Sequence, residues 1–195
     1  TGKEASIFVV SDGKDFKIIG TAQDHKRAFD NDDGPNTGGM GAISPAPSLD
    51  DSTFKKIITD IIQPTINGMK LENKKYEGIL YAGVMITKDG PKLIEFNCRL
   101  GDPEAQVILP LLETDIVEIM IKSISNNLKD IEINFKTKKA ITVVLASKGY
   151  PGEFKKDIIL PNIPSYNDSN DLIIYHAGTK LNKNDELISN GGRVL

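Results

Sequence analysis

The sequence predicts a mixed α+β fold in which strands pair mainly as antiparallel hairpins. Residues 5–20 form one expected hairpin, because a turn at 12–15 lies between two apolar runs. A tight turn at Asp89-Gly90 joins two further strands within residues 77–98. Apolar residues recur at helical spacing from 52 to 69, which predicts a helix that packs on the sheet.

The other elements follow from turn residues and apolar spacing. Residues 21–47 are rich in Gly, Asn, Asp and Pro, so we expect a long loop there. Asp50 or Ser52 is expected to cap the helix that follows, and Pro64 to kink it or end its regular part. We expect helices at 104–112 and 114–128 (with Ile116, Val117, Met120 and Ile124 on one face), a polar linker at 130–139, strands at 140–146 and 172–176, a turn at 149–152 and the start of a last strand at 191–195.

Composition excludes several classes of protein. The chain has 195 residues, 39% hydrophobic and 26% charged, as expected of an ordinary globular protein. A formal net charge of −3 gives no electrostatic reason to expect nucleic acid or an anionic membrane as a partner. The single cysteine, Cys98, excludes an internal disulfide, and the apolar run at 79–86 is far shorter than the roughly 20 residues of a membrane span. We therefore expect a cytoplasmic protein.

Both ends are strand-like, which suggests a piece of a longer chain.

The stretch at 94–104 is the most informative part of the chain. Side chains alternate faces along a strand, so Glu95, Asn97 and Arg99 are expected to share one face, with Ile94, Phe96 and Cys98 on the other. A carboxylate and an amide oxygen suit Mg²⁺, and an arginine beside them would stabilise phosphoryl oxygens. The alternative is a solvated strand edge of mixed charge. Asn is rare in strands, and the turn at 101–104 adds two carboxylates, which favours a site.

The glycine-rich loop at 30–41 is a second candidate site. Glycines let backbone N–H groups surround an oxyanion, although the acidic residues of this loop would need Lys26, Arg27 or a metal to offset them. The alternative is a flexible surface loop. Cys98 is not expected to be a nucleophile, and His25 and His176 are the only histidines, which excludes a site with several histidine ligands.

Together these segments resemble the phosphoribosylamine–glycine ligase family, also called glycinamide ribonucleotide synthetases. The stretch Arg99-Leu100-Gly101-Asp102-Pro103-Glu104 is close to diagnostic of that family. The other segments that carry the resemblance are 23–27, 34–41, 44–47, Tyr81-Ala82-Gly83, Tyr150-Pro151-Gly152, 176–179 and 190–195.

The resemblance implies an ATP-grasp fold, here the carboxyl-terminal half of the family's chain. Residues 1–128 would be the second part of the catalytic domain, and 129–195 a truncated C-terminal α/β domain. The implied activity joins glycine to 5-phosphoribosylamine through a glycyl phosphate, giving glycinamide ribonucleotide, ADP and phosphate in purine biosynthesis. The implied cofactors are ATP and Mg²⁺ or Mn²⁺, and the implied state is a monomer.

The same resemblance implies roles for individual residues. Glu95 and Asn97 would bind the metal, and Arg99 and Asp102 would be catalytic. Glu4 and Lys26 would face the nucleotide. The residues implied to border glycine and phosphoribosylamine are Asp24, Asn36, Thr37, Gly38, Gly39, Met40, Gly41 and Asp102. Many ATP-grasp enzymes carry another acidic ligand on the preceding strand, but residues 81–85 contain no carboxylate.

Two alternatives stay open. The chain could belong to another ATP-grasp carboxylate–amine ligase with a different acceptor, or it could act only as a non-catalytic binding fragment.

Overall fold

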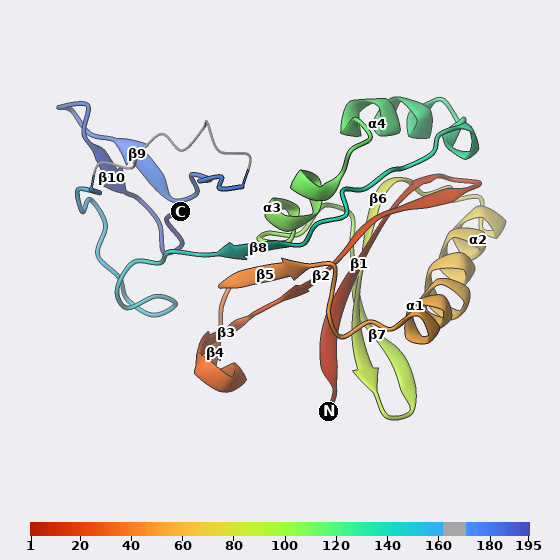
Figure 1. Cartoon of the computed structure of the whole chain (residues 1–195), viewed down its shortest axis with the longest axis horizontal. Helices are drawn as coiled ribbons and strands as arrows, with labels where there is room; N and C mark the ends of the chain where they lie inside the picture. The colour runs from red at the N-terminus through yellow and green to blue at the C-terminus, as the bar shows by residue number, and fades with distance from the viewer. Residues whose placement is uncertain (162–170) are drawn as a thin grey trace. The chain divides into compact units, whose positions relative to one another are not determined.

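The two predicted hairpins are present and adjacent in the computed structural model (Figure 1). β1 (Lys3–Asp12) pairs antiparallel with β2 (Phe16–Asp24) on one side and with β6 (Glu77–Thr87) on the other. β7 (Gly90–Asn97) returns along β6. With β5 (Gly41–Ser44) and β8 (Ala140–Val143) they form a six-stranded sheet in the order β7-β6-β1-β2-β5-β8, which confirms the predicted α+β class.

The structure describes residues 1–161 and 171–195, and these form two compact units. The first unit consists of Thr1–Asp24 and Ala42–Thr142, and the second of His25–Gly41 and Val143–Leu195. The expected domain boundary between residues 128 and 129 stays a prediction.

β1 is apolar on both of its faces because helices cover both sides of the sheet. Ala5, Ile7 and Val9 point into one cluster of buried side chains, while Phe8 and Val10 point into another. α1 (Asp51–Ile57) and α2 (Gln63–Leu71) cover the first face; α3 (Ala105–Ile108) and α4 (Ile116–Ile124) cover the second (Figure 1). The sheet is thus the middle layer of the first unit.

The first helix begins as predicted, because the Asp50 carboxylate accepts a 2.7 Å hydrogen bond from the Thr53 N–H. The π-helical turn η2 (Ile58–Ile62) links α1 to α2, and Pro64 lies in the first turn of α2. The regular α-helix is interrupted next to Pro64, as expected, although Gln63 keeps helical dihedral angles and the chain stays helical into α2. The wider turn before Pro64 accommodates its missing N–H.

The predicted buried face of α4 is partly wrong. Ile119 and Ser123 are buried, and Ile116 and Met120 pack against the core. Val117 and Ile124, expected on the same face, are 60% and 71% exposed. Ser123 was not expected there, and its hydroxyl donates a 2.7 Å hydrogen bond to the Ser11 carbonyl.

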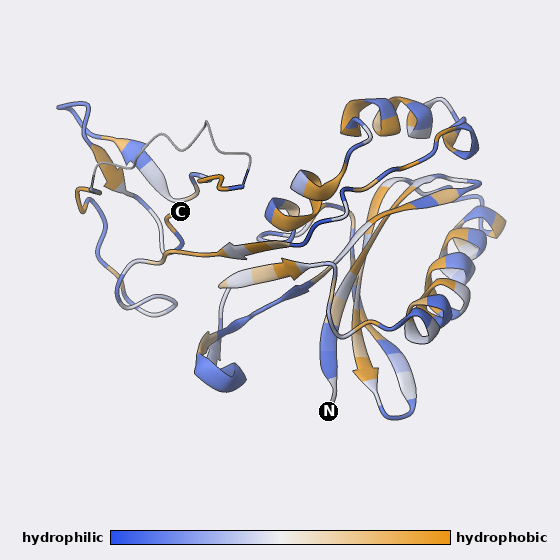
Figure 2. Cartoon of the chain, viewed as in Figure 1, coloured by the Kyte–Doolittle hydropathy of each residue, from blue (hydrophilic) through white to orange (hydrophobic). Residues whose placement is uncertain are grey.

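The expected loop at 21–47 contains regular structure instead. β2 continues to Asp24, and a short hairpin of β3 (Arg27–Phe29) and β4 (Asp33–Asn36) follows. The 3₁₀ turn η1 (Asp30–Asp32) forms its tip, which is strongly hydrophilic (Figure 2). β3 has only three residues and β4 consists of turn-forming residues, so their length and composition hid the pairing.

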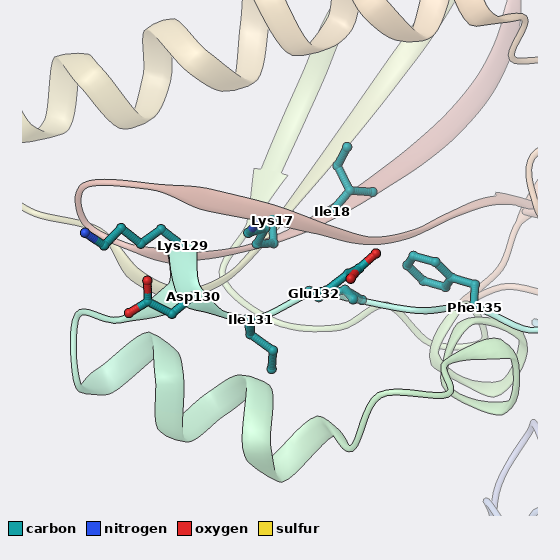
Figure 3. A pocket seen from close by; sticks show the side chains of 8 residues that line it. Lys17, Ile18, Lys129, Asp130, Ile131, Glu132 and Phe135 are labelled. Carbon is teal, nitrogen blue, oxygen red and sulfur yellow. The ribbon is translucent and has the colours of Figure 1, made fainter.

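The expected linker at 130–139 packs on the first unit. The short turns η3 (Leu109–Leu111) and η4 (Leu128–Asp130) precede it, and Phe135 forms a bridge with Leu112. Ile131 is 6% exposed and points toward α4 (Figure 3). A groove of about 500 Å³ separates this segment from β2; it is lined by Lys17, Ile18, Lys129, Asp130, Ile131, Glu132, Ile133 and Phe135 (Figure 3). No predicted site residue lines it.

The second unit contains a small hairpin that the sequence did not predict. β9 (Thr179–Leu181) pairs antiparallel with β10 (Leu187–Ser189). The strand expected at 172–176 is wrong, since those residues form no ladder. The expected last strand is reduced to a bridge between Arg193 and Ala146. Within the two described stretches of chain, no helix is both long enough and apolar enough to cross a membrane.

Asp12 joins the β1–β2 turn to the end of the α4 region. Its carboxylate accepts hydrogen bonds from the N–H groups of Lys14 (2.9 Å), Asp15 (2.8 Å) and Leu128 (3.2 Å). Burial raises the pKa of this carboxyl, but the three N–H groups lower it more, so the pKa lies below its ordinary value of 3.8. The charged form is therefore the form that stabilises the fold.

Replacing Asp12 with Asn should lower the free energy of unfolding at pH 7 by about 2 kcal/mol. The amide has one acceptor oxygen where the carboxylate has two, so the Leu128 N–H loses its acceptor when the oxygen stays with Lys14 and Asp15. The unfolded chain protonates this carboxyl near pH 4 and the folded chain only at lower pH. The difference between wild type and Asp12→Asn in urea unfolding should therefore shrink below about pH 4. Asp15→Asn, at an exposed position, is the control; an equal loss there would contradict the role of Asp12.

Candidate cation site and glycine-rich loop

Glu95 and Asn97 lie side by side at the end of β7. The Asn97 amide Nδ2 donates a 3.2 Å hydrogen bond to the Glu95 carboxylate, which confirms that the two side chains share one face. Glu95 is exposed and Asn97 is half-buried. The pair is thus open to a ligand from solvent.

Arg99 lies beyond the end of β7, so the prediction that it shares the face of Glu95 and Asn97 cannot rest on strand periodicity and stays a prediction. β7 ends at Asn97, and Arg99 lies in the bend that follows, where its Nη1 donates a 2.9 Å hydrogen bond to the Leu100 carbonyl. The strict alternation is also broken at Ile94, because the β6–β7 register shifts between Gly83 and Val84. Simple strand periodicity therefore holds for the metal pair but not for the whole motif.

The surface beneath Glu95 is built by β6 and β1. Gly83 is opposite Glu95 on β7 and opposite Ser6 on β1, so these residues share one face of the sheet. The Tyr81 ring stacks on Phe8 with centroids 4.9 Å apart. A Cβ at Gly83 would lie 3.2 Å from the Tyr81 hydroxyl oxygen and 3.4 Å from Glu95 Cγ. The absence of a side chain at Gly83 lets these two groups share that space.

Glu104 approaches the same face from the turn after β7. Its side chain is 4% exposed, and the Ser6 hydroxyl lies 3.3 Å from Glu104 Oε1 and 3.1 Å from the Tyr81 hydroxyl. The carboxylate folds against Gly101, where a Cβ would come within 2.3 Å of Oε2. Any residue other than glycine at 101 would displace this carboxylate.

Oxygen donors of this kind fit a hard divalent cation. Glu95 contributes a carboxylate and Asn97 an amide oxygen, which are ligands that Mg²⁺ prefers. In residues 1–161 and 171–195, no group of three or more His, Cys, Asp or Glu side chains could hold a metal by itself. A cation here would thus depend on phosphate oxygens and water for its other ligands.

Cys98 lies on the opposite side of β7 from Glu95, as predicted. Burial and a hydrogen bond with the Cys98 thiol raise the pKa of the Tyr76 hydroxyl, and Tyr76 packs with the cluster under α1 and α2. The other residue considered for chemistry, His176, is exposed and contacts Thr179 Oγ1 at 3.1 Å.

The glycine-rich loop belongs to the second unit and is held closed by its own backbone. The Thr37 N–H donates to the Lys26 carbonyl at 2.7 Å, and the Met40 N–H donates to the His25 carbonyl at 2.8 Å. The Thr37 hydroxyl accepts a 3.0 Å hydrogen bond from the Gly39 N–H. These bonds bring the predicted residues Lys26, Asn36, Thr37, Gly38, Gly39, Met40 and Gly41 into one ordered loop.

Two residues that the sequence did not single out as site residues fix the centre of this loop. Arg193 Nη1 donates a 2.7 Å hydrogen bond to the Gly38 carbonyl, and the Tyr150 hydroxyl accepts a 2.9 Å hydrogen bond from the Gly38 N–H. A Cβ at Gly38 would lie 3.0 Å from the Arg193 guanidinium carbon. Both residues lie in segments that carry the family resemblance. The resemblance was therefore the one sequence feature that could have identified them.

The remaining predicted residues lie in the first unit. Glu4 is half-buried on β1, two positions before Ser6 and on the same face of the sheet. Asp102 is exposed, and its carboxylate accepts a 3.3 Å hydrogen bond from Gln106. Asp24 is the last residue of β2. The first unit thus brings Glu4, Glu95 and Asn97 to one face of the sheet.

Comparison with known proteins gives the family. Residues 1–105 match the model of the phosphoribosylglycinamide synthetase ATP-grasp (A) domain, and residues 140–195 match the C domain of the same enzyme. The chain belongs to the phosphoribosylglycinamide synthetase family. The resemblance read from the sequence and the ATP-grasp fold are both confirmed.

Relatives of this family are similar over the whole chain. A phosphoribosylamine–glycine ligase of Caldanaerobacter subterraneus subsp. tengcongensis is 46% identical over 194 residues, which are 100% of this chain and 46% of the relative. The Homo sapiens trifunctional purine biosynthetic protein adenosine-3 is 46% identical over 195 residues, 19% of its length. The crystal structure of the Thermotoga maritima phosphoribosylamine–glycine ligase superposes with a TM-score of 0.83 at 35% identity, covering 100% of this chain and 47% of that one. The chain thus spans about half the length of the single-function ligases.

Tyr150→Phe should loosen the glycine-rich loop, because it removes the oxygen that accepts the Gly38 N–H. We expect backbone amide hydrogen exchange at Gly38 to become about tenfold faster, as for the loss of one hydrogen bond. Lys148→Ala, at an exposed neighbouring position, is the control. Unchanged exchange at Gly38 in Tyr150→Phe would show that the contact does not hold the loop.

Proposed function

We propose that this chain is the carboxyl-terminal part of an ATP-dependent ligase that joins glycine to 5-phosphoribosylamine. The products are glycinamide ribonucleotide, ADP and phosphate. The observation that carries the proposal is the Glu95–Asn97 pair on one face of β7, directly before the 99–104 motif, in a chain that matches both family domains. The proposed cofactors are ATP and Mg²⁺ or Mn²⁺, and glycine and 5-phosphoribosylamine are the small-molecule substrates.

The proposed mechanism assigns phosphoryl transfer to the end of β7. Glu95 and Asn97 would hold the divalent cation, which supplies charge neutralisation on the phosphates when bound. Arg99 is exposed at the start of the turn, and its guanidinium would stabilise the phosphoryl group as it passes to the glycine carboxylate. Little covalent chemistry is then required of the protein, since positioning and charge stabilisation lower the barrier.

The second step is attack by the sugar amine on the glycyl phosphate, with release of phosphate. We assign the borders of the glycine and phosphoribosylamine sites to Asp24, Asp102 and the loop at 36–41. The hydrogen bonds that the loop's own N–H groups make support this role, because they fix the shape that the loop presents to a ligand. Glu4 and Lys26 are proposed to face the nucleotide. A cytoplasmic location and a monomeric state stay predictions.

Two alternatives are separated by experiment. Another ATP-grasp carboxylate–amine ligase would release ADP with a different amine acceptor. A non-catalytic binding or interaction module is tested by calorimetry of this chain alone with Mg-ATP, because micromolar binding would contradict that alternative. The proposal requires ADP release by the full-length protein that carries this chain, dependent on both glycine and 5-phosphoribosylamine, and release with another acceptor only would contradict it.

Glu95→Gln and Arg99→Ala in that full-length protein should each lower kcat at least about a hundredfold, because each removes charge stabilisation of the transferring phosphoryl group. Glu77→Gln, on an exposed carboxylate at the start of β6, is the matched control and should keep normal turnover. Near-normal turnover in Glu95→Gln or Arg99→Ala, measured as ADP release, would show that the roles are wrongly assigned.

A further inference from the structure

A buried polar network lies directly beside the proposed cation pair and has no part in the mechanism above. Its members are Ser6 on β1, Tyr81 on β6 and Glu104 in the turn after β7, and their exposed fractions are 1%, 4% and 4%. Buried polar groups are costly unless they are paired, so three of them in contact require an explanation.

The Ser6 hydroxyl connects the other two members of the network. The Ser6 hydroxyl lies 3.3 Å from Glu104 Oε1 and 3.1 Å from the Tyr81 hydroxyl. The Tyr81 hydroxyl oxygen and Glu95 Cγ both lie next to Gly83, 3.2 Å and 3.4 Å from the position that a Cβ of Gly83 would take. Hydrogen bonds therefore join the buried Glu104 carboxylate through Ser6 to Tyr81, and the Tyr81 hydroxyl and the Glu95 side chain flank the same space at Gly83.

The backbone of both strands is adapted to this arrangement. Gly83 leaves open the space that Tyr81 and Glu95 share, and Gly101 leaves open the space that the Glu104 carboxylate fills. Stacking on Phe8 fixes the Tyr81 ring, so the hydroxyl has one direction available. A Glu95 side chain bounded on one side by a fixed hydroxyl has fewer orientations to lose when it binds a ligand.

We propose that Glu104, Ser6 and Tyr81 are positioning residues that hold Glu95 in its cation-binding orientation and set the affinity of the site for a divalent cation. This inference rests on the proposed function, because it assumes that Glu95 binds the cation. It assigns a physical role to two segments of the family resemblance, Tyr81-Ala82-Gly83 and the glutamate of the 99–104 motif. Residues that orient a metal ligand in this way typically change metal affinity 10- to 100-fold when they are replaced.

The test is a titration of Mn²⁺ by electron paramagnetic resonance in the presence of ADP, with the full-length protein that carries this chain. Tyr81→Phe, Ser6→Ala and Glu104→Gln should each raise the Kd for Mn²⁺ about tenfold. Tyr81→Phe is the decisive variant, because it removes one oxygen and keeps the stack on Phe8. It decides the matter even if Glu104→Gln fails to fold.

Two matched controls separate positioning from general stability. Tyr76→Phe removes a hydroxyl that donates to the Ile79 carbonyl on the opposite side of the sheet, and Ser11→Ala removes a buried hydroxyl from the same strand as Ser6. Both should leave the Kd for Mn²⁺ within about twofold of wild type, although they cost stability.

Failure of this inference and failure of the proposed function give different results. If Glu95→Gln weakens Mn²⁺ binding but the three network variants bind as wild type does, the network proposal is overturned and the cation site stands. If Glu95→Gln itself leaves the Kd unchanged, the cation site is wrong and the network proposal falls with it. Equal weakening in the network variants and in the two controls would also overturn it.

Discussion

The register of β6 between β1 and β7 is the constraint on which the candidate site depends. It aligns Ser6, Gly83 and Glu95 across three strands, and a shift of β6 by one residue would put Ala82 or Val84 in place of Gly83 and turn Tyr81 to the other face. That register is strongly specified, because Ala82 and Val84 are buried on one face and Tyr81 on the other. Burial of the two apolar layers therefore determines where the polar groups of the site lie.

The turn after β7 places two further carboxylates, those of Asp102 and Glu104. The Ala105 N–H donates a 3.0 Å hydrogen bond to the Gly101 carbonyl, so the 101–104 segment is a turn that leads directly into α3. This turn directs Glu104 back under the sheet while Asp102 stays exposed. One short motif thus supplies an exposed carboxylate, on Asp102, and a buried one, on Glu104. The two carboxylates lie in different environments.

The sequence predicted the parts of the fold that depend on local patterns. The two long hairpins have turn residues between apolar runs, and both are present. The β3–β4 hairpin was missed because β3 has only three residues and β4 consists of residues that favour turns, and the strand expected at 172–176 did not form. Exposure along α4 was misjudged because several apolar residues of that helix, among them Val117 and Ile124, remain on the surface of the described chain.

The part of the candidate site that lies on a single strand, β7, could be predicted from the sequence. Period-two alternation placed Glu95 beside Asn97, but it does not apply to Arg99, which lies beyond the end of the strand. The contacts of Ser6 with Glu104 join residues 98 positions apart, and those of Arg193 with Gly38 join residues 155 apart. No local pattern encodes such pairs, since they arise from strand order and chain packing.

The most direct test of the central claim is to locate the cation itself. Crystals of the full-length protein grown with Mn²⁺ and ADP would give an anomalous difference peak. The account predicts a peak about 2–2.5 Å from a Glu95 carboxylate oxygen and from the Asn97 amide oxygen. A well-ordered Mn²⁺ that binds the nucleotide phosphates without contact to either residue would contradict it.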